Sequence, residues 1–342
     1  MKKKILALLL AAAVVMSLAA CGGDANQGGN TPANADQNEP AGPAAPNEPA
    51  GEVYSVGISQ YVTHDALDAA TNGFIDAMNE KFGEDGWKYD LQNAADDPAT
   101  CSTIANAFVS QNVDLIMANA TPALQAAAAA TGDIPILGTS VTEYGVAFGI
   151  KDFSGTLGNN VSGTSDLAPL DQQAQMIKEW FPDAKAIGLL YCSNEDNSQY
   201  QVDTVQRYLE ELGYTCTQYA FSDSNDIAAV CQIAVDASDV LYIPTDNSAA
   251  SNTGIIDNIC RGNIPVFCGE EGLCKGCGVA TLSISYYDIG YKTGEMAAQV
   301  LTGEAQISEM AIEYAPEFVK KYNPAMCEAL GVTAPEGYEA IA

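Results

Sequence analysis

The sequence is short of positive charge and of histidine. Its 342 residues include 14 Lys and Arg against 44 Asp and Glu, a formal net charge of −30 at pH 7, and His64 is the single histidine. A chain with so few cations would repel a nucleic acid or an anionic lipid. We therefore expect no nucleic-acid partner. A neutral or zwitterionic small molecule is the easier ligand.

Common catalytic motifs are also missing. The chain has no Gly-x-Ser-x-Gly elbow and no phosphate-binding Gly-x-x-x-x-Gly-Lys loop, and it offers one histidine for proton transfer. We expect a binding protein rather than an enzyme, and no cofactor. Carboxylate chemistry through Glu270 and Glu271 is the enzymatic alternative, and turnover of a bound ligand would support it.

The cysteines do not form the pattern of a disulfide scaffold. Nine follow Cys21, an odd number, and they are scattered through apparent strands and helices. Most are expected to be small buried hydrophobic residues. Cys274 and Cys277, with Cys268 nearby, have a metal-like spacing but lack the second pair or the histidines of a structural zinc site. We expect no metal, and either a local disulfide or free thiols at these three positions.

The first 21 residues have the pattern of an export signal. Three lysines precede an apolar run at residues 5–15, and Leu-Ala-Ala stands directly before Cys21. The run is too short to span a bilayer, which is typical of a cleaved signal. Cys21 resembles the acylated cysteine of a bacterial lipobox, and an ordinary secretory signal is the alternative. We expect residues 1–21 to be a lipoprotein signal peptide, with an extracytoplasmic protein anchored through Cys21.

Residues 22–52 differ in composition from the rest of the chain. They are mainly Gly, Ala, Asn, Pro, Gln, Asp and Glu, with almost no large apolar side chain. Such a segment cannot bury enough surface to offset the entropy lost on ordering, so we expect a disordered tether. No later stretch is apolar enough to cross a membrane, and the lipid is the expected membrane contact.

The remaining chain has the alternating pattern of an α/β protein. Strand-like runs separated by single amphipathic stretches occur at residues 53–59, 87–91, 113–117 and 134–137, and again at 186–191, 214–219, 239–243 and 264–267. Short strands with helical crossovers predict a mostly parallel sheet covered by helices on both faces. The repeat of the pattern predicts two doubly wound lobes joined by crossing segments.

Two segments are candidates for those crossings. Residues 159–166 are polar, and residues 279–283 precede a helix whose apolar side suits packing on the first lobe. We expect lobe 1 to comprise residues 53–160 and 281–310, and lobe 2 residues 161–280 and 311–342. Two such sheets facing each other make a hinged cleft, and ligands gather at the carboxyl ends of parallel strands.

Polar residues follow nearly every expected strand. Helix capping explains part of this enrichment, but hydroxyls beside helix-start amides also bind carboxylates. Asp246, Glu270 and Glu271 are acceptors for an ammonium group, so one cleft would suit an amino acid. Aromatic residues near the same ends are either a stacking platform or core. The candidate ligand-binding residues are Ser59, Gln60, His64, Asn119, Thr121, Ser140, Thr142, Thr164, Ser165, Asn194, Asp246, Asn247 and Glu270.

Several blocks together resemble a known family. They are Gly-Ile-Ser-Gln at 57–60 with His64, Val-Ser-Gly-Thr-Ser-Asp at 161–166, Pro-Thr-Asp-Asn at 244–247, Gly-Glu-Glu-Gly at 269–272, and Tyr-Tyr-Asp-Ile-Gly at 286–290. In this order they resemble the ABC-transporter substrate-binding lipoproteins of the tryptophan and tyrosine type. Cys274 and Cys277 depart from that pattern.

The resemblance implies a type I periplasmic-binding-protein fold whose lobes close on a small ligand and deliver it to a permease. It places Ser140, Thr164, Ser165, Asp246 and Glu270 in the ligand site. We expect the ligand carboxylate to meet hydroxyls that include Ser140 and Thr142, and its ammonium to meet Asp246, assisted by Glu270. A tryptophan or tyrosine ligand and a monomer are expected. The alternatives are a nucleoside, a sugar or a peptide-derived metabolite as ligand, or a ligand-sensing or adhesin surface lipoprotein.

Overall fold

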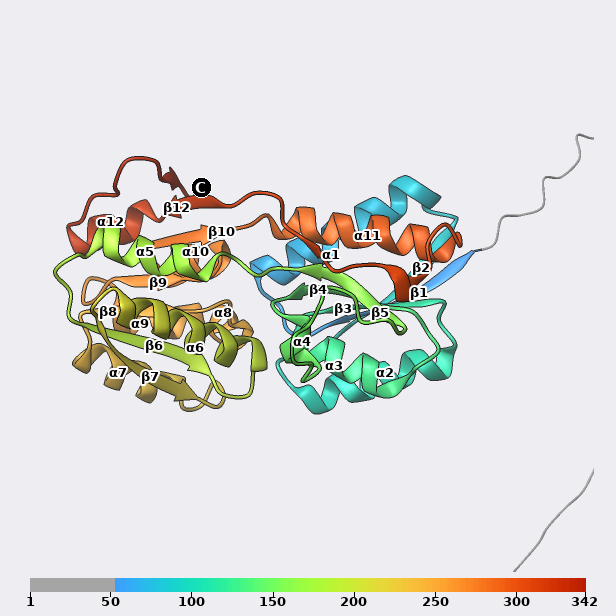
Figure 1. Cartoon of the computed structure of the whole chain (residues 1–342), viewed down its shortest axis with the longest axis horizontal. Helices are drawn as coiled ribbons and strands as arrows, with labels where there is room; N and C mark the ends of the chain where they lie inside the picture. Colours follow the sequence, from blue (N-terminus) through green and yellow to red (C-terminus); the bar gives the residue numbers. More distant parts are fainter. Residues whose placement is uncertain (1–52) are drawn as a thin grey trace, which may run out of the picture. The chain divides into compact units, whose positions relative to one another are not determined.

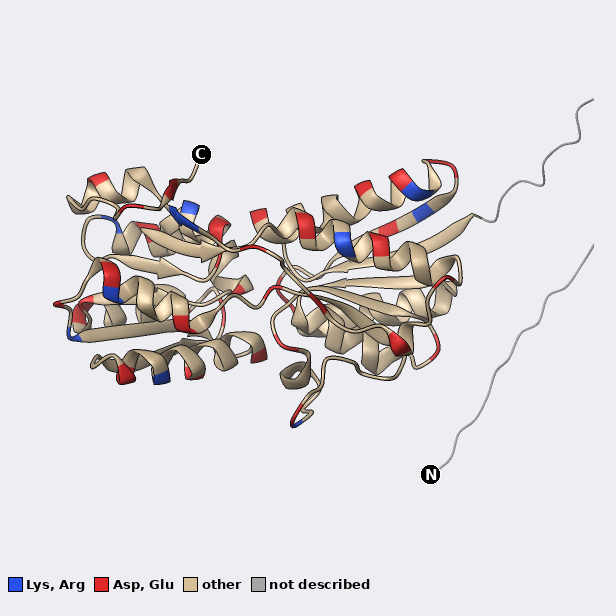
Figure 2. Cartoon of the chain, turned by 45° about the horizontal axis from the view of Figure 1, so that its top comes forward, with Lys and Arg blue, Asp and Glu red and all other residues tan. Residues whose placement is uncertain are grey.

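The computed structural model describes residues 53–342, which contain two β-sheets with helices on both faces of each (Figure 1). The expected signal peptide, Cys21 and tether lie outside the described residues. Acidic residues greatly outnumber basic ones in both lobes (Figure 2). Within the described range, no helix combines the length and apolar character needed to cross a membrane.

The first sheet has six strands, all paired in parallel. Their order is β11 (Glu313–Tyr314), β5 (Val161–Ser165), β4 (Ile136–Val141), β3 (Leu115–Asn119), β1 (Tyr54–Gln60) and β2 (Trp87–Asn93). One face is covered by α1 (Asp65–Phe82) and α11 (Tyr286–Leu301), the other by α2 (Pro98–Gln111) and α3 (Thr121–Ala130) (Figure 1). The short α4 (Tyr144–Ala147) and the 3-10 turn η1 (Ile307–Glu309) complete this lobe. Each face buries an apolar cluster, centred on Phe74 and Met296 under α1 and α11, and on Phe108 and Leu124 under α2 and α3.

The second sheet has seven strands. Their order is β13 (Glu339–Ala340), β12 (Val319–Tyr322), β10 (Ala280–Ser283), β9 (Val266–Cys268), β8 (Val240–Ile243), β6 (Ala186–Cys192) and β7 (Thr215–Phe221). One face carries α5 (Leu170–Trp180), α6 (Asp196–Glu211) and α12 (Pro324–Leu330); the other carries α7 (Ile227–Ala237), α9 (Thr253–Cys260) and α10 (Glu271–Cys277). A short helix, α8 (Asn247–Ser251), follows β8. β10 and β12 are antiparallel, which the βαβ pattern does not predict.

The α/β class and the two lobes are confirmed, but the crossings lie elsewhere than expected. β5 pairs with β4 in the first sheet, so the chain crosses after Ser165, not before Val161. β11 also returns to the first sheet, beside β5. The polar character of residues 159–166 suggested a linker. The same residues are small, and the close pairing of β5 with β4 requires small residues. A Cβ on Gly163, where φ is 147°, would lie 2.1 Å from the Gly138 carbonyl oxygen.

The second crossing is also displaced. Residues 280–283 form β10 of the second sheet, paired with β9, and the chain passes to the first lobe at Ile284–Ser285. The third passage lies between β11 and β12. Lobe 1 therefore extends to Ser165 and takes in α11 and β11, whereas β10 belongs to lobe 2. The lobe boundaries expected at residues 160 and 281 are therefore wrong for β5 and β10. Strand pairing, not composition, decides to which lobe a segment belongs.

The carboxyl ends of the two sheets meet at a seam between the lobes. Ser248 Oγ, at the start of α8, donates to Asp96 Oδ1 of lobe 1 at 2.7 Å. His64 Nε2 lies 3.2 Å from Asn247 Oδ1, and Gln201 Nε2 lies 3.5 Å from Thr142 Oγ1. Each of these contacts joins one lobe to the other. The polar residues that follow the strands are thus gathered in one region, as expected for two facing α/β lobes.

Candidate functional site

Buried polar atoms without partners are concentrated at the carboxyl edge of the first sheet. Within residues 53–342, no hydrogen bond is made by Ser59 Oγ, Asn119 Oδ1, Thr121 Oγ1, Ser140 Oγ or Asp166 Oδ1. We call these five residues the unpaired cluster. They follow or end the adjacent strands β1, β3, β4 and β5. Buried polar atoms in proteins nearly always have a partner, so this concentration points to a bound molecule that would supply one.

The backbone at this edge is strained. Ala120, just after β3, has φ of 92°, and Ser140, within β4, has φ of 55°. Side-chain-bearing residues are rarely found in this region, and such conformations cost of order 1–3 kcal/mol each. The register between β4 and β5 shifts between Gly138 and Val141, which places Ser140 in the irregularity. Strain of this kind collects at ligand sites because the surrounding fold holds it in place.

Asp166 is the acid of the unpaired cluster. Its side chain is buried, and Tyr286 Oη donates to Oδ2 at 2.8 Å while Oδ1 is free of any partner in the described part of the chain. Burial raises the pKa of this carboxyl. No Lys or Arg within residues 53–342 forms an ion pair with it. A ligand cation would therefore stabilise a charge that the protein leaves uncompensated.

Asp246 is buried on the opposite side of the seam, but both of its oxygens are occupied. Oδ1 accepts from Ala249 N at 2.8 Å and Oδ2 from Cys192 N at 2.6 Å. Burial, with the nearby charge of Glu195, raises the pKa of Asp246 to about 8. The side chain thus caps α8 and ties it to the end of β6. Helix capping, which explains part of the polar enrichment after the strands, therefore accounts for Asp246.

Glu195 is a buried acid that the sequence pattern did not select. It is fully buried and accepts from Ser248 N at 2.9 Å, from Asn247 N at 3.2 Å and from Asn247 Nδ2 at 2.6 Å. Asn197 Nδ2 donates to it as well, at 3.1 Å. Burial raises the pKa of Glu195. Glu195 directly precedes α6, and its other partners, Asn247 and Ser248, lie more than fifty residues away in the sequence, so the local pattern carried no signal of this role.

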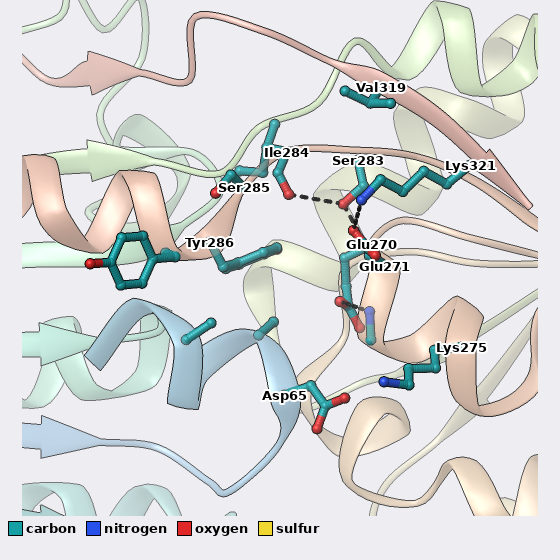
Figure 3. A pocket seen from close by; sticks show the side chains of 14 residues that line it. Asp65, Glu270, Glu271, Lys275, Ser283, Ile284, Ser285, Tyr286, Val319 and Lys321 are labelled. Carbon is teal, nitrogen blue, oxygen red and sulfur yellow. Dashed lines mark hydrogen bonds and ion pairs between the residues drawn. The ribbon is translucent and has the colours of Figure 1, made fainter. Parts of the chain in front are cut away.

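Glu270 caps the N-terminus of α10 and borders a cavity between the lobes. Its carboxylate accepts from Gly272 N at 2.6 Å and from Leu273 N, and burial raises its pKa to about 7. The cavity has a volume of about 340 Å³ and is lined by α1, α10, the end of β10 and the start of α11. Figure 3 shows Asp65 of α1 across this space from Glu270 and Lys275. A second hollow, of about 240 Å³, adjoins it and is lined in part by His64.

Three of the predicted site residues have side chains engaged within lobe 1. Gln60 donates to Val62 O and Asp68 and accepts from Thr71. Thr164 Oγ1 shares a hydrogen bond with Thr293 at 2.9 Å, and Ser165 Oγ donates to Thr142 O at 2.8 Å. These residues hold β1, β5 and α11 in place around the site.

The other predicted residues fall into three groups. Ser59, Asn119, Thr121 and Ser140 belong to the unpaired cluster. His64, Thr142 and Asn247 bridge the seam. Asn194 is exposed and donates to Ser222 O at 2.8 Å, so the structure does not bring it to the others. Asp166 was missed because it was assigned to a linker; placing β5 in the first sheet would have identified it by the same rule as its neighbours.

A family model for ABC transporter substrate binding proteins matches residues 55–342. The chain therefore belongs to this family, as its sequence blocks predicted. The architecture, two parallel-sheet lobes joined by three crossings, is that of the type I periplasmic binding proteins.

Individual relatives extend the comparison. A protein of Clostridioides difficile named "Tyrosine-binding protein" is 41% identical over 254 residues, 73% of each chain. The ABC domain of Streptococcus pneumoniae in complex with L-Trp is 30% identical, with a TM-score of 0.80 over 85% of this chain and 100% of its own. A ligand-free, open substrate-binding protein with adhesive properties from Clostridium difficile is 38% identical, with a TM-score of 0.64 over 84% of this chain and 99% of its own. The backbone described here is thus nearer to the L-Trp complex than to that open structure.

Proposed function

We propose that this chain is the extracytoplasmic, lipid-anchored receptor of an ABC importer and that it binds one aromatic amino acid, tyrosine or tryptophan, between its lobes. The observation that carries the proposal is the unpaired cluster, in which hydroxyls and one acid at a single sheet edge lack partners within residues 53–342. A zwitterion supplies the complementary groups. The relatives named for tyrosine and complexed with L-Trp support an aromatic side chain.

The ligand's two charged ends have separate partners in this proposal. Its ammonium meets Asp166 Oδ1, and its carboxylate accepts from the hydroxyls of Ser59, Thr121 and Ser140. This differs from the sequence-based expectation that Asp246 and Glu270 receive the ammonium, because the oxygens of both side chains already accept backbone N–H groups. The protein releases the ligand unaltered, in keeping with a family of binding proteins.

Calorimetry with a panel of ligands tests this proposal. Protein lacking residues 1–21 is titrated with L-tyrosine, L-tryptophan, L-leucine, tyramine, N-acetyl-L-tyrosine, a nucleoside and a sugar. We expect one of the aromatic amino acids to bind. Tyramine, which lacks the carboxylate, and N-acetyl-L-tyrosine, which lacks the ammonium, should each bind at least about tenfold more weakly, since each leaves a buried charged or polar group unpaired. Binding of a nucleoside or a sugar, with none of the amino acids, would overturn the proposal.

The lipid anchor and the location outside the cytoplasm rest on the lipobox resemblance at Cys21. Detergent phase partition of the full chain expressed in a bacterium tests this part. The unaltered protein should enter the detergent phase and Cys21→Ser the aqueous phase. Equal partition of the two proteins would argue for an ordinary secretory signal.

One observation favours a second candidate function, adhesion at the cell surface. A 38% identical relative is described as a substrate-binding protein with adhesive properties. Both functions are compatible with a tethered receptor. Attachment of the purified protein to host cells, measured with and without saturating amino acid, tests the second.

A further inference from the structure

Two cysteines of the second lobe lie in contact, far apart in the sequence. Cys231 is in α7 and Cys260 is the last residue of α9, and their Sγ atoms are 3.7 Å apart. Both side chains are buried, with relative exposures of 0% and 1%. They share an apolar cluster with Ile227, Ile256 and Ile264, on the face of the second sheet that carries α7, α9 and α10. The unpaired cluster of the ligand site belongs to the other lobe.

We propose that Cys231 and Cys260 are a redox-active pair that closes into a disulfide joining α7 to α9. The sulfur atoms must approach from 3.7 Å to the bond length of about 2.05 Å, a change that side-chain rotation can supply. All nine cysteines in residues 53–342 are free thiols in the structure, so the pair is present in its reduced form.

The oxidant we assign to this step is hydrogen peroxide, which is little larger than water. In the step proposed, Cys231 is the thiolate, and Cys260, whose Sγ atom is 3.7 Å away, is placed to donate its thiol proton toward it. The Cys231 thiolate attacks one peroxide oxygen, the O–O bond breaks, and hydroxide leaves and takes up the thiol proton as water. The resulting sulfenic acid on Cys231 is attacked by Cys260 sulfur, the S–O bond breaks, and the hydroxyl leaves with the Cys260 proton as a second water.

This sequence of steps balances, because two thiols and one peroxide give one disulfide and two waters. The thiol sulfurs are oxidised and the peroxide is reduced.

The neighbouring thiols are placed differently. Cys277 Sγ donates to Leu273 O at 3.4 Å within α10, which gives that thiol a backbone partner. Burial raises the pKa of both Cys268 and Cys274.

The disulfide would close a loop of 29 sequence positions. Cross-linking of this kind stabilises a protein chiefly by restricting the unfolded chain. Because α7 and α9 contribute no residue to the unpaired cluster, the link should stabilise lobe 2 without changing ligand affinity. The inference therefore stands independently of the proposed function.

Peptide mapping after peroxide treatment tests the pair. Protein lacking residues 1–21 is incubated with hydrogen peroxide, denatured, alkylated and digested without reductant. We expect two of the nine thiols to be lost, a peptide linking Cys231 to Cys260, and a Tm higher by about 5 °C. Cys231→Ser should show neither the link nor the rise, and Cys216→Ser, which alters a half-buried thiol outside the pair, should show both.

Three results would overturn the proposal. They are the absence of the linked peptide from peroxide-treated wild-type protein, a link among Cys268, Cys274 and Cys277 instead, and a Tm rise that Cys231→Ser retains. Mapping of the wild-type protein decides the matter even if a variant fails to fold.

Discussion

At the scale of single residues, two buried acids at the seam have opposite surroundings. Asp246 accepts from two backbone amides, whereas one oxygen of Asp166 has no partner among residues 53–342. An acid whose oxygens are satisfied contributes to stability, and one that is left unsatisfied costs stability until a ligand arrives. In the proposed function, Asp246 is a structural carboxylate and Asp166 is the one that meets the ligand.

Matched substitutions test this distinction. Asp166→Asn removes the charge that would face the ligand ammonium, and we expect Kd for the preferred amino acid to rise about 10- to 100-fold, equivalent to about 1.5–3 kcal/mol. Asp246→Asn keeps one acceptor but turns a donor toward a backbone N–H, so the free energy of unfolding should fall by about 1–2 kcal/mol while Kd changes little. Calorimetry and urea denaturation measure the two effects. A large rise in Kd for Asp246→Asn, with little change for Asp166→Asn, would show that the ligand ammonium meets Asp246, as the sequence suggested.

At the scale of elements, α1 and α11 pack backbone to backbone through glycines. A Cβ on Gly290 would lie 1.9 Å from Ala70 O, and one on Gly73 would lie 2.1 Å from Tyr287 O. Close approach allows Tyr286, the first residue of α11, to reach Asp166. The packing of this helix pair thus helps to position Asp166 of the candidate site, although α1 and α11 are separated by more than two hundred residues.

Gly290→Ala tests the role of this contact. The added methyl group has no space, and we expect the free energy of unfolding to fall by about 2–3 kcal/mol or more. Gly254→Ala is the control, because a Cβ there meets nothing within 4 Å and alanine is favoured over glycine in the first turn of α9, where Gly254 lies. That variant should be about 0.5–1 kcal/mol more stable. Urea denaturation of both proteins gives the comparison, and a Gly290→Ala protein as stable as wild type would show that the helices can move apart freely.

At the scale of the two lobes, the closure that we propose would draw on polar contacts across the seam. The Ser248–Asp96 hydrogen bond, at 2.7 Å, involves a carboxylate and forms only where the lobes meet. A ligand that binds the closed arrangement draws on such contacts, because they add to the difference in free energy between open and closed states. Their loss should weaken ligand binding more than folding.

Ser248→Ala tests this link between closure and affinity. We expect Kd to rise about tenfold, equivalent to about 1.4 kcal/mol, with the free energy of unfolding of the ligand-free protein changed by less than about 0.5 kcal/mol. Ser251→Ala, in the same helix, removes a hydroxyl that bonds to Ser248 O within lobe 2 and should leave Kd unchanged. Small-angle scattering with and without ligand follows closure directly. Equal affinities for the two variants would contradict a role for the Ser248 contact.

The sequence by itself determined the fold class, the family and the edge of the sheets at which the candidate site lies. These follow from local patterns, namely strand and helix periodicity and polar residues directly after buried strands. Ser59, Asn119, Thr121 and Ser140 were found by that rule because each follows or ends a strand whose pattern is clear. The helix α11 was likewise expected to pack on the first lobe through Met296 and its neighbours, and it does.

Only the tertiary structure decided which polar residue is satisfied and which is not. Asp246 and Asp166 both follow strands. The backbone amides that donate to the Asp246 carboxylate belong to Cys192 and Ala249. Asp166 could be assigned to the candidate site only once β5 was known to pair with β4. The contact between Cys231 and Cys260 depends in the same way on the packing of α7 against α9. Hydrogen bonding and thiol contact are set by neighbours in space, and residues distant in sequence become neighbours only when the chain is folded.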